Sequence, residues 1–137
     1  MRQNESKLQT ACVNWFRMQY PKLSPVLFAV PNGGQRAKKI VRTRSGLLKK
    51  VSVEGKRLKE EGALSGVADL LLLYPNRENH CLAIEMKYGK NTQSTNQKNW
   101  QKGVTPLGVR YEVVNTFEKF QALISEYLQD TDFGKKN

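Results

Sequence analysis

Histidine and cysteine are scarce in this sequence. There is one histidine, His80, and there are two cysteines, Cys12 and Cys81. The cysteines lack the short spacing of a zinc site, and a Ser-His-Asp triad would depend on a single histidine. The composition therefore argues against zinc chemistry and against serine-hydrolase chemistry. In a reducing compartment we expect both cysteines to be buried free thiols.

Long apolar runs are also missing. No stretch approaches the roughly 18 apolar residues that indicate a transmembrane helix. The first residues, MRQNESKLQ, are polar where a secretory signal would have an apolar segment. There is also no basic amphipathic helix long enough to indicate binding to a membrane surface. We therefore expect a cytoplasmic protein without a membrane partner.

Acidic residues are few relative to basic residues. The 137-residue chain has 23 Lys and Arg against 12 Asp and Glu, which gives a formal charge of +11 and a pI near 9.8. Such an excess favours a polyanionic partner. The length fits one domain with one core. We assign this domain to residues 1–129 and expect a polar tail at 130–137.

Residues 66–87, GVADLLLLYPNRENHCLAIEMK, combine two short apolar runs with charged residues. Asp69 precedes the first run, and Glu85 and Lys87 close the second. Side chains alternate along a strand, so we expect Glu85 and Lys87 on one face and Met86 on the other. Two carboxylates and an ammonium would then meet at one edge of a strand pair. A bound divalent cation would satisfy this group, and so would a structural ion pair, so the spacing leaves both interpretations open.

These residues resemble the metal-dependent nucleases of the PD-(D/E)xK superfamily and, within it, the VRR-NUC family. The motif consists of Asp69 followed by Glu85-Met86-Lys87. Together with other matching segments, the resemblance covers most of residues 5–128. These segments are PNGGQR at 31–36, GALSGVAD at 62–69, and Gln97 with Trp100.

Ala68 departs from the family pattern, which usually has proline before the aspartate. The change loses some backbone rigidity and removes no chemical group. The resemblance implies an α/β fold with a restriction-endonuclease-like core, in which a central mixed β-sheet is flanked by helices. It also implies a DNA endonuclease that uses Mg²⁺, with Mn²⁺ as a substitute and no small-molecule cofactor.

The resemblance also assigns roles to individual residues. Asp69, Glu85 and the backbone carbonyl of Met86 would bind the metal, and Lys87 would hold or deprotonate the attacking water. Stand-alone members of the family are associated with homodimers that cut four-way (Holliday) junctions, so we expect a homodimer on branched DNA. The alternatives are a monomeric flap nuclease and a non-catalytic basic module that binds nucleic acid.

Glu5 and Gln97 each have two interpretations. An acid in the first turn of a helix is stabilised by the helix dipole, whereas the family resemblance makes Glu5 a candidate metal contact. Ser94-Thr95-Asn96-Gln97 fits a capping box, whereas the resemblance places Gln97 beside the catalytic lysine. One side chain cannot fully serve both purposes, so we expect Gln97 to act in the site and Ser94 to cap the helix.

Residues 36–59 hold ten basic residues and a single acid, Glu54. A charged run is usually a solvated face, but this excess favours an arm that follows the phosphate backbone of DNA. A hairpin around Ser45-Gly46 would form the arm. The PNGG turn before it would bring backbone N–H groups near a phosphate, although a plain turn is the commoner explanation. The proposed DNA contacts are Asn32, Gly33, Gly34, Arg36, Lys38, Lys39, Arg42, Arg44, Lys49 and Lys50.

The remaining pattern predicts alternating helices and strands. We expect a helix over 4–19 with Asn4 as its N-cap, and a short strand over 26–30. A helix over 54–61 should end at Gly62, and the sequence 103–108 should break the helix that follows Ser94. The final elements are a strand over 109–114 and a helix capped by Thr116.

Overall fold

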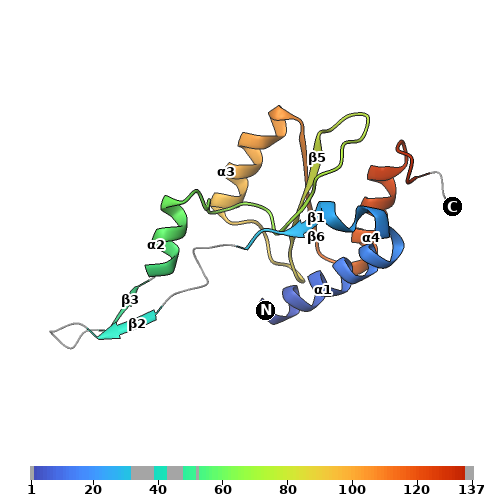
Figure 1. Cartoon of the computed structure of the whole chain (residues 1–137). Helices are drawn as coiled ribbons and strands as arrows, with labels where there is room; N and C mark the ends of the chain where they lie inside the picture. The colour runs from blue at the N-terminus through green and yellow to red at the C-terminus, as the bar shows by residue number, and fades with distance from the viewer. Residues whose placement is uncertain (1, 32–38, 43–47, 52, 135–137) are drawn as a thin grey trace.

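The computed structural model describes residues 2–31, 39–42, 48–51 and 53–134. The chain forms an α/β fold, as the sequence predicts (Figure 1). Its elements in chain order are α1 (Arg2–Gln19), the 3-10 helix η1 (Pro21–Val26), β1 (Leu27–Ala29), β2 (Lys39–Arg42), β3 (Leu48–Val51), α2 (Val53–Glu60), β4 (Leu70–Leu72), β5 (Cys81–Met86), α3 (Thr95–Val104), the 3-10 helix η3 (Thr105–Leu107), β6 (Val109–Val114) and α4 (Phe117–Leu128).

The central sheet has four strands in the order β1-β4-β5-β6. β4 runs antiparallel to both β1 and β5, and β6 runs parallel to β5. A parallel pair needs a crossover connection, which α3 and η3 provide between β5 and β6. The sheet is therefore mixed, as predicted. Helices cover both of its faces.

One face of the sheet carries the main hydrophobic core. Leu82, Ile84 and Met86 of β5 point to this face and are buried. α1 contributes Cys12 and Phe16, and both side chains are fully buried. α4 packs an apolar stripe on the same core, and its buried residues are Phe120, Leu123, Ile124, Tyr127 and Leu128.

The other face carries a smaller cluster under α3. Ala68, Ala83 and Tyr111 are buried there, and Trp100 of α3 packs against them, 5.9 Å from Tyr111 between ring centroids. The small alanine side chains let α3 approach this face. Ala83 and Glu85 are two residues apart on β5, so their side chains lie on the same face of the sheet. This cluster is therefore next to the candidate site.

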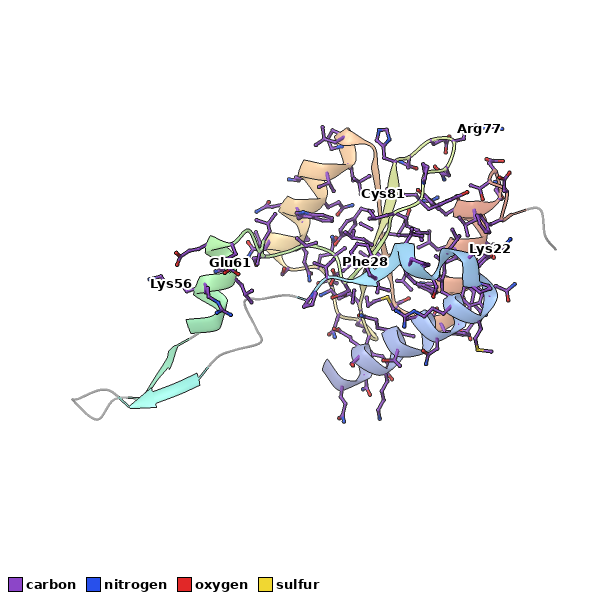
Figure 2. The ribbon with its side chains drawn as sticks, viewed as in Figure 1. Lys22, Phe28, Lys56, Glu61, Arg77 and Cys81 are labelled. Atoms are coloured by element: carbon purple, nitrogen blue, oxygen red, sulfur yellow. The ribbon has the colours of Figure 1, made fainter. Side chains whose placement is uncertain are left out.

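The basic segment forms a second sheet of two strands. β2 and β3 pair antiparallel, as predicted, with Lys39 opposite Val51 and Arg42 opposite Leu48. Together with α2, this ribbon projects away from the central sheet (Figure 1). Glu61, which follows α2, lies at the end of the helix nearest the core, and the exposed Lys56 lies midway along the helix (Figure 2). The expected turn at Ser45-Gly46 lies outside the described residues.

Gly62 ends α2 as the sequence predicts. Its φ of +113° is in the left-handed region that favours glycine. The N–H groups of Gly62 and Ala63 donate to the carbonyls of Lys59 and Leu58 at 3.1 and 2.8 Å. This pair of bonds is a Schellman motif, which satisfies the last carbonyls of the helix.

Several element boundaries differ from the prediction. Asn4 lies inside α1 and is not its N-cap, because the helix already begins at Arg2. The segment from Pro21 to Val26 is a 3-10 helix, and the strand that follows is limited to Leu27–Ala29. Gly103 belongs to α3, which breaks only after Val104.

Of the remaining local predictions, the N-cap of α4 and the burial of one of the two cysteines are confirmed. Thr116 caps α4 by accepting from the Lys119 N–H at 3.1 Å. Cys12 is buried, whereas Cys81 is partly exposed, contrary to expectation. Among the helices of the described ranges, none has the length and apolar character needed to cross a membrane.

Candidate active site

Asp69 and Glu85 lie side by side because β4 and β5 pair in a fixed register. Leu70 lies opposite Ile84, so the residue before Leu70 lies beside the residue after Ile84. Asp69 is held in place by the backbone, because its Oδ2 accepts from the Met86 N–H at 2.7 Å. The N–H and C=O groups of one strand residue point to the same side, so the Met86 carbonyl is also directed toward Asp69.

Glu85 is the buried charged group of the site, with only 2% of its surface exposed. Its Oε2 accepts from the Gln97 Nε2 at 2.8 Å and lies 3.5 Å from the Lys87 Nζ. Its other oxygen, Oε1, is buried and has no hydrogen-bond partner. A buried carboxylate oxygen without a partner is costly unless a ligand or proton satisfies it.

Both carboxylates of the site have a raised pKa. The pKa of Glu85 is raised to about 8, chiefly by burial and then by the nearby charge of Asp69, while Lys87 opposes the shift. Burial also raises the pKa of Asp69, against the lowering effect of the Met86 N–H. A positive charge at this edge would relieve both shifts.

Gln97 acts both as a cap and as a site residue. Its Oε1 accepts from the Ser94 N–H at 2.8 Å, which completes the capping box at the start of α3. Its Nε2 donates to Glu85 at the same time. The prediction that one side chain cannot serve both purposes is wrong, because the two ends of the amide are used separately. The cap thereby fixes the orientation of the donor.

Glu5 reaches the loop that follows β5. Its Oε2 accepts from the Asn91 Nδ2 at 3.0 Å and from the Tyr88 N–H at 3.4 Å. Its charge also contributes to the raised pKa of Asp69. Glu5 therefore borders the site and anchors this loop, in addition to lying in the first turn of α1.

The donor set, which consists of oxygen atoms, fits Mg²⁺ or Mn²⁺ better than zinc or copper. No group of three or more His, Cys, Asp or Glu side chains forms a metal site within the described ranges. Mg²⁺ is commonly held by one or two carboxylates and keeps several waters. Asp69, the unpartnered Oε1 of Glu85 and the Met86 carbonyl offer such a set. The contribution of Glu5 as a metal ligand stays a prediction.

Three residues near the site were not predicted from the sequence. Asn91 holds Glu5. Tyr111 lies on the same face as Glu85, and burial raises its pKa to about 12, with smaller contributions from Glu85 and Asp69. Asn115 follows β6, and its Oδ1 is buried without a partner. The alternating pattern of residues 109–114 predicts the strand that contains Tyr111. The sequence does not show that Ala83 lies opposite Tyr111 in the parallel pair.

The proposed DNA contacts are only partly within the described residues. Lys39 and Arg42 belong to β2, and Lys49 and Lys50 belong to β3. These four basic residues therefore lie on two adjacent strands, and each is paired across the ribbon with an apolar residue. The contacts that lie outside the described residues are Asn32, Gly33, Gly34, Arg36, Lys38 and Arg44.

A mixed sheet flanked by helices, with two carboxylates and a lysine at one strand edge, is the arrangement of a nuclease with a restriction-endonuclease-like fold. The family model for the VRR-NUC domain matches residues 3–118. This chain therefore belongs to the VRR-NUC family.

A solved structure described as a VRR_NUC domain protein has the same fold. It is 20% identical in sequence, with a TM-score of 0.71, and the alignment covers 93% of this chain and 90% of that one. No protein among the curated sequences matches this chain.

Proposed function

We propose that this protein is a Mg²⁺-dependent, structure-selective DNA endonuclease that acts as a homodimer on four-way (Holliday) junctions. Membership of the VRR-NUC family supports a nuclease. The observation that carries the metal dependence is the unpartnered Oε1 of Glu85, which is buried beside Asp69. A structural ion pair with Lys87 engages Oε2 and would leave Oε1 dependent on a proton, whereas a divalent cation would satisfy Oε1 without one.

Different residues of the chain would carry out different parts of the hydrolysis. Asp69 and Glu85, with the Met86 carbonyl, would hold Mg²⁺, and Gln97 keeps Glu85 in position. Mg²⁺ supplies Lewis acidity to the scissile phosphate and makes water a stronger nucleophile. The Lys87 Nζ would hold or deprotonate the attacking water and offset the phosphate charge. The water loses a proton as its oxygen forms a bond to phosphorus, the bond to the departing oxygen breaks, and the departing oxygen takes up a proton from the solvent.

The basic ribbon supports binding to DNA without reading its sequence. Lysine and arginine contacts to phosphates fix the position of a protein but carry no sequence information directly. Residues 36–59 contribute ten of the 23 basic residues of the chain. We therefore propose selectivity for DNA shape. A two-fold dimer matches the two-fold symmetry of a four-way junction, which needs two cuts for resolution.

Cleavage of a panel of labelled DNAs tests this function. We expect Mg²⁺-dependent cutting of a four-way junction in preference to flap, hairpin and single-stranded DNA of the same length. Light scattering at micromolar concentration should give the mass of two chains. A monomer that cuts flaps and leaves junctions intact would identify a flap nuclease. DNA binding without cleavage at any Mg²⁺ or Mn²⁺ concentration would identify a non-catalytic module.

Neutralising basic residues of the ribbon should weaken DNA binding on every sequence tested. In the double variant Lys49→Gln/Lys50→Gln, each lost phosphate contact should flatten the salt dependence of affinity by about 0.9 in log-log slope. The matched control is Lys22→Gln/Arg77→Gln, which removes two positive charges from exposed positions outside the ribbon (Figure 2). Fluorescence anisotropy at several salt concentrations measures both slopes. Equal slopes for the two variants would make the ribbon a solvated surface.

A further inference from the structure

The outer edge of β6 is open to another strand. β6 is an end strand of the central sheet, and within the described part of the chain no strand pairs with its outer side. It has six residues, whereas β1 at the opposite end has three. A long unpaired edge is a template for strand addition.

The bonds between β5 and β6 show which backbone groups are available at this edge. The Gly108 carbonyl accepts from the His80 N–H at 2.7 Å, and the Val114 carbonyl accepts from the Lys87 N–H at 2.9 Å. Both carbonyls therefore point to β5. The direction of these groups alternates along a strand. The residues whose N–H and C=O groups point outward are Val109, Tyr111 and Val113.

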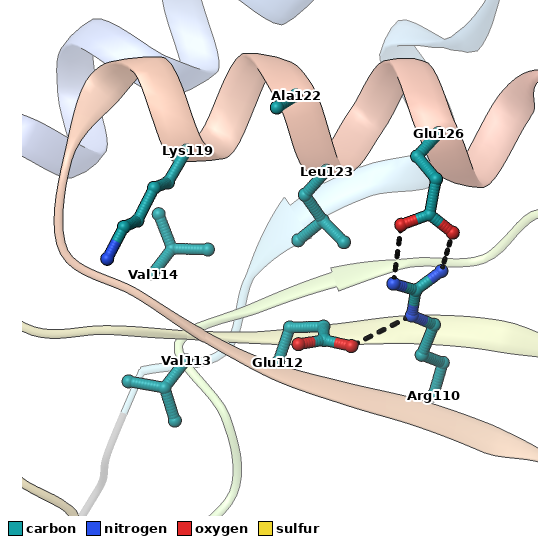
Figure 3. A pocket seen from close by; sticks show the side chains of 8 residues that line it. All are labelled: Arg110, Glu112, Val113, Val114, Lys119, Ala122, Leu123 and Glu126. Atoms are coloured by element: carbon teal, nitrogen blue, oxygen red, sulfur yellow. Dashed lines mark hydrogen bonds and ion pairs between the residues drawn. The ribbon is translucent and has the colours of Figure 1, made fainter.

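The side chains along this edge are balanced in charge. Arg110 donates to Glu112 at 2.9 Å and to Glu126 of α4 at 2.7 and 2.8 Å (Figure 3). Lys119 lines the same hollow, which has a volume of about 390 Å³. Two cations thus lie among two carboxylates in a chain whose formal charge is +11. Two copies of a strongly basic chain repel each other overall, so a neutral edge is where they can approach.

Charge selects one register for two antiparallel β6 strands. With Tyr111 on the two-fold axis, Arg110 of each copy lies opposite Glu112 of the other, and Val109 lies opposite Val113. The adjacent registers with the same backbone bonding place Arg110 opposite Arg110 or Glu112 opposite Glu112. Like charges directly opposite each other destabilise a strand pair. The favoured register also uses the backbone groups of all three outward-pointing residues.

We propose that two copies of this chain pair through their β6 strands, antiparallel around Tyr111, and join their sheets into one continuous sheet. The inference names the contact surface of the homodimer in the proposed function, and it rests on that homodimer. The segment Val-Arg-Tyr-Glu-Val at 109–113 complements itself under a two-fold rotation, so the partner is a second copy. Val113, which is 42% exposed in the single chain, would then lie opposite Val109 of the second copy.

Charge reversal with rescue tests the register. Glu112→Lys places a lysine opposite Arg110 at both ends of the pair, and we expect the dimer dissociation constant to rise by about 100-fold. Adding Arg110→Glu exchanges the two charges and should restore the dissociation constant to within about tenfold of the natural value. The control Glu126→Gln removes an intrachain partner of Arg110 without changing the cross-strand pair, and it should stay dimeric. Analytical ultracentrifugation at one salt concentration measures all four proteins.

A proline tests the backbone pairing independently of charge. Val113→Pro removes an outward N–H and leaves the bonds to β5 in place, so we expect a folded monomer by circular dichroism with unchanged Mn²⁺ affinity.

A dimer that survives both Glu112→Lys and Val113→Pro would overturn the β6 contact and leave the homodimer standing. A double charge variant as monomeric as Glu112→Lys would overturn the register. A natural chain that is monomeric throughout would overturn the homodimer itself, whereas Mg²⁺-dependent cutting of flap DNA reports on the nuclease separately.

Discussion

Replacing Glu85 by glutamine is expected to abolish DNA cleavage while the protein still folds and binds DNA. Glutamine has the shape of glutamate and can still accept from Gln97, which now donates to Glu85 at 2.8 Å. It cannot supply the negative charge that a divalent cation needs. We expect cleavage to fall by at least about 10³-fold.

The same substitution should stabilise the metal-free protein at alkaline pH. The raised pKa of Glu85, about 8 against its ordinary 4.5, means that the folded chain keeps a proton that the unfolded chain releases. The stability that this proton provides is fully present below about pH 4.5 and is lost as the pH rises through about 8. Glutamine cannot ionise, so the melting temperature of Glu85→Gln should exceed that of the natural chain by more at pH 9 than at pH 5.

Calorimetry separates the metal assignment from a structural role. Asp69→Asn and Glu85→Gln should each lose most of the Mg²⁺ or Mn²⁺ binding, and Mg²⁺ should stabilise the natural chain but neither of these variants. The exposed acid Glu78 provides a control, since Glu78→Gln leaves both carboxylates of the site intact. If Asp69→Asn and Glu85→Gln bind Mn²⁺ as tightly as the control does, these residues are not the metal ligands.

The pairing that forms the site could be predicted from the sequence because it is local. Asp69 and Glu85 belong to two apolar runs that are joined by a short polar segment, and such runs favour an antiparallel strand pair. The alternation of side chains then places Glu85 and Lys87 on one face. The observed register, with Leu70 opposite Ile84, brings Asp69 beside Glu85.

The contacts between distant segments could not be predicted in the same way. Glu5 and Asn91 are 86 positions apart, and their hydrogen bond depends on how α1 packs beside β5. The neighbours of Tyr111 follow from the parallel pairing of β5 with β6, which hydrophobic alternation does not specify. The double role of Gln97 was missed for another reason, because a capping box describes only the oxygen end of the amide.

Removing the charge of Lys87 is expected to lower turnover while metal binding survives. The Lys87 side chain is 13% exposed, and its Nζ lies 3.5 Å from Glu85 Oε2, so it borders the site without being a metal ligand. Lys87→Met keeps an unbranched side chain of similar length and removes the ammonium. We expect turnover to fall by about 10²- to 10⁴-fold. The control is Lys90→Met, which removes an exposed ammonium from the loop after β5.

Arginine at position 87 distinguishes the two proposed roles of the lysine. Arg keeps a positive charge but does not release a proton at ordinary pH. If charge on the phosphate is what matters, Lys87→Arg should retain much more activity than Lys87→Met in single-turnover assays with saturating Mg²⁺. If Lys87 takes a proton from the attacking water, both variants should be equally slow. The pH–rate profile of each variant should then lack one ionisation that the natural enzyme shows. Full activity in Lys87→Met would exclude both roles and leave the lysine as a partner of Glu85 alone.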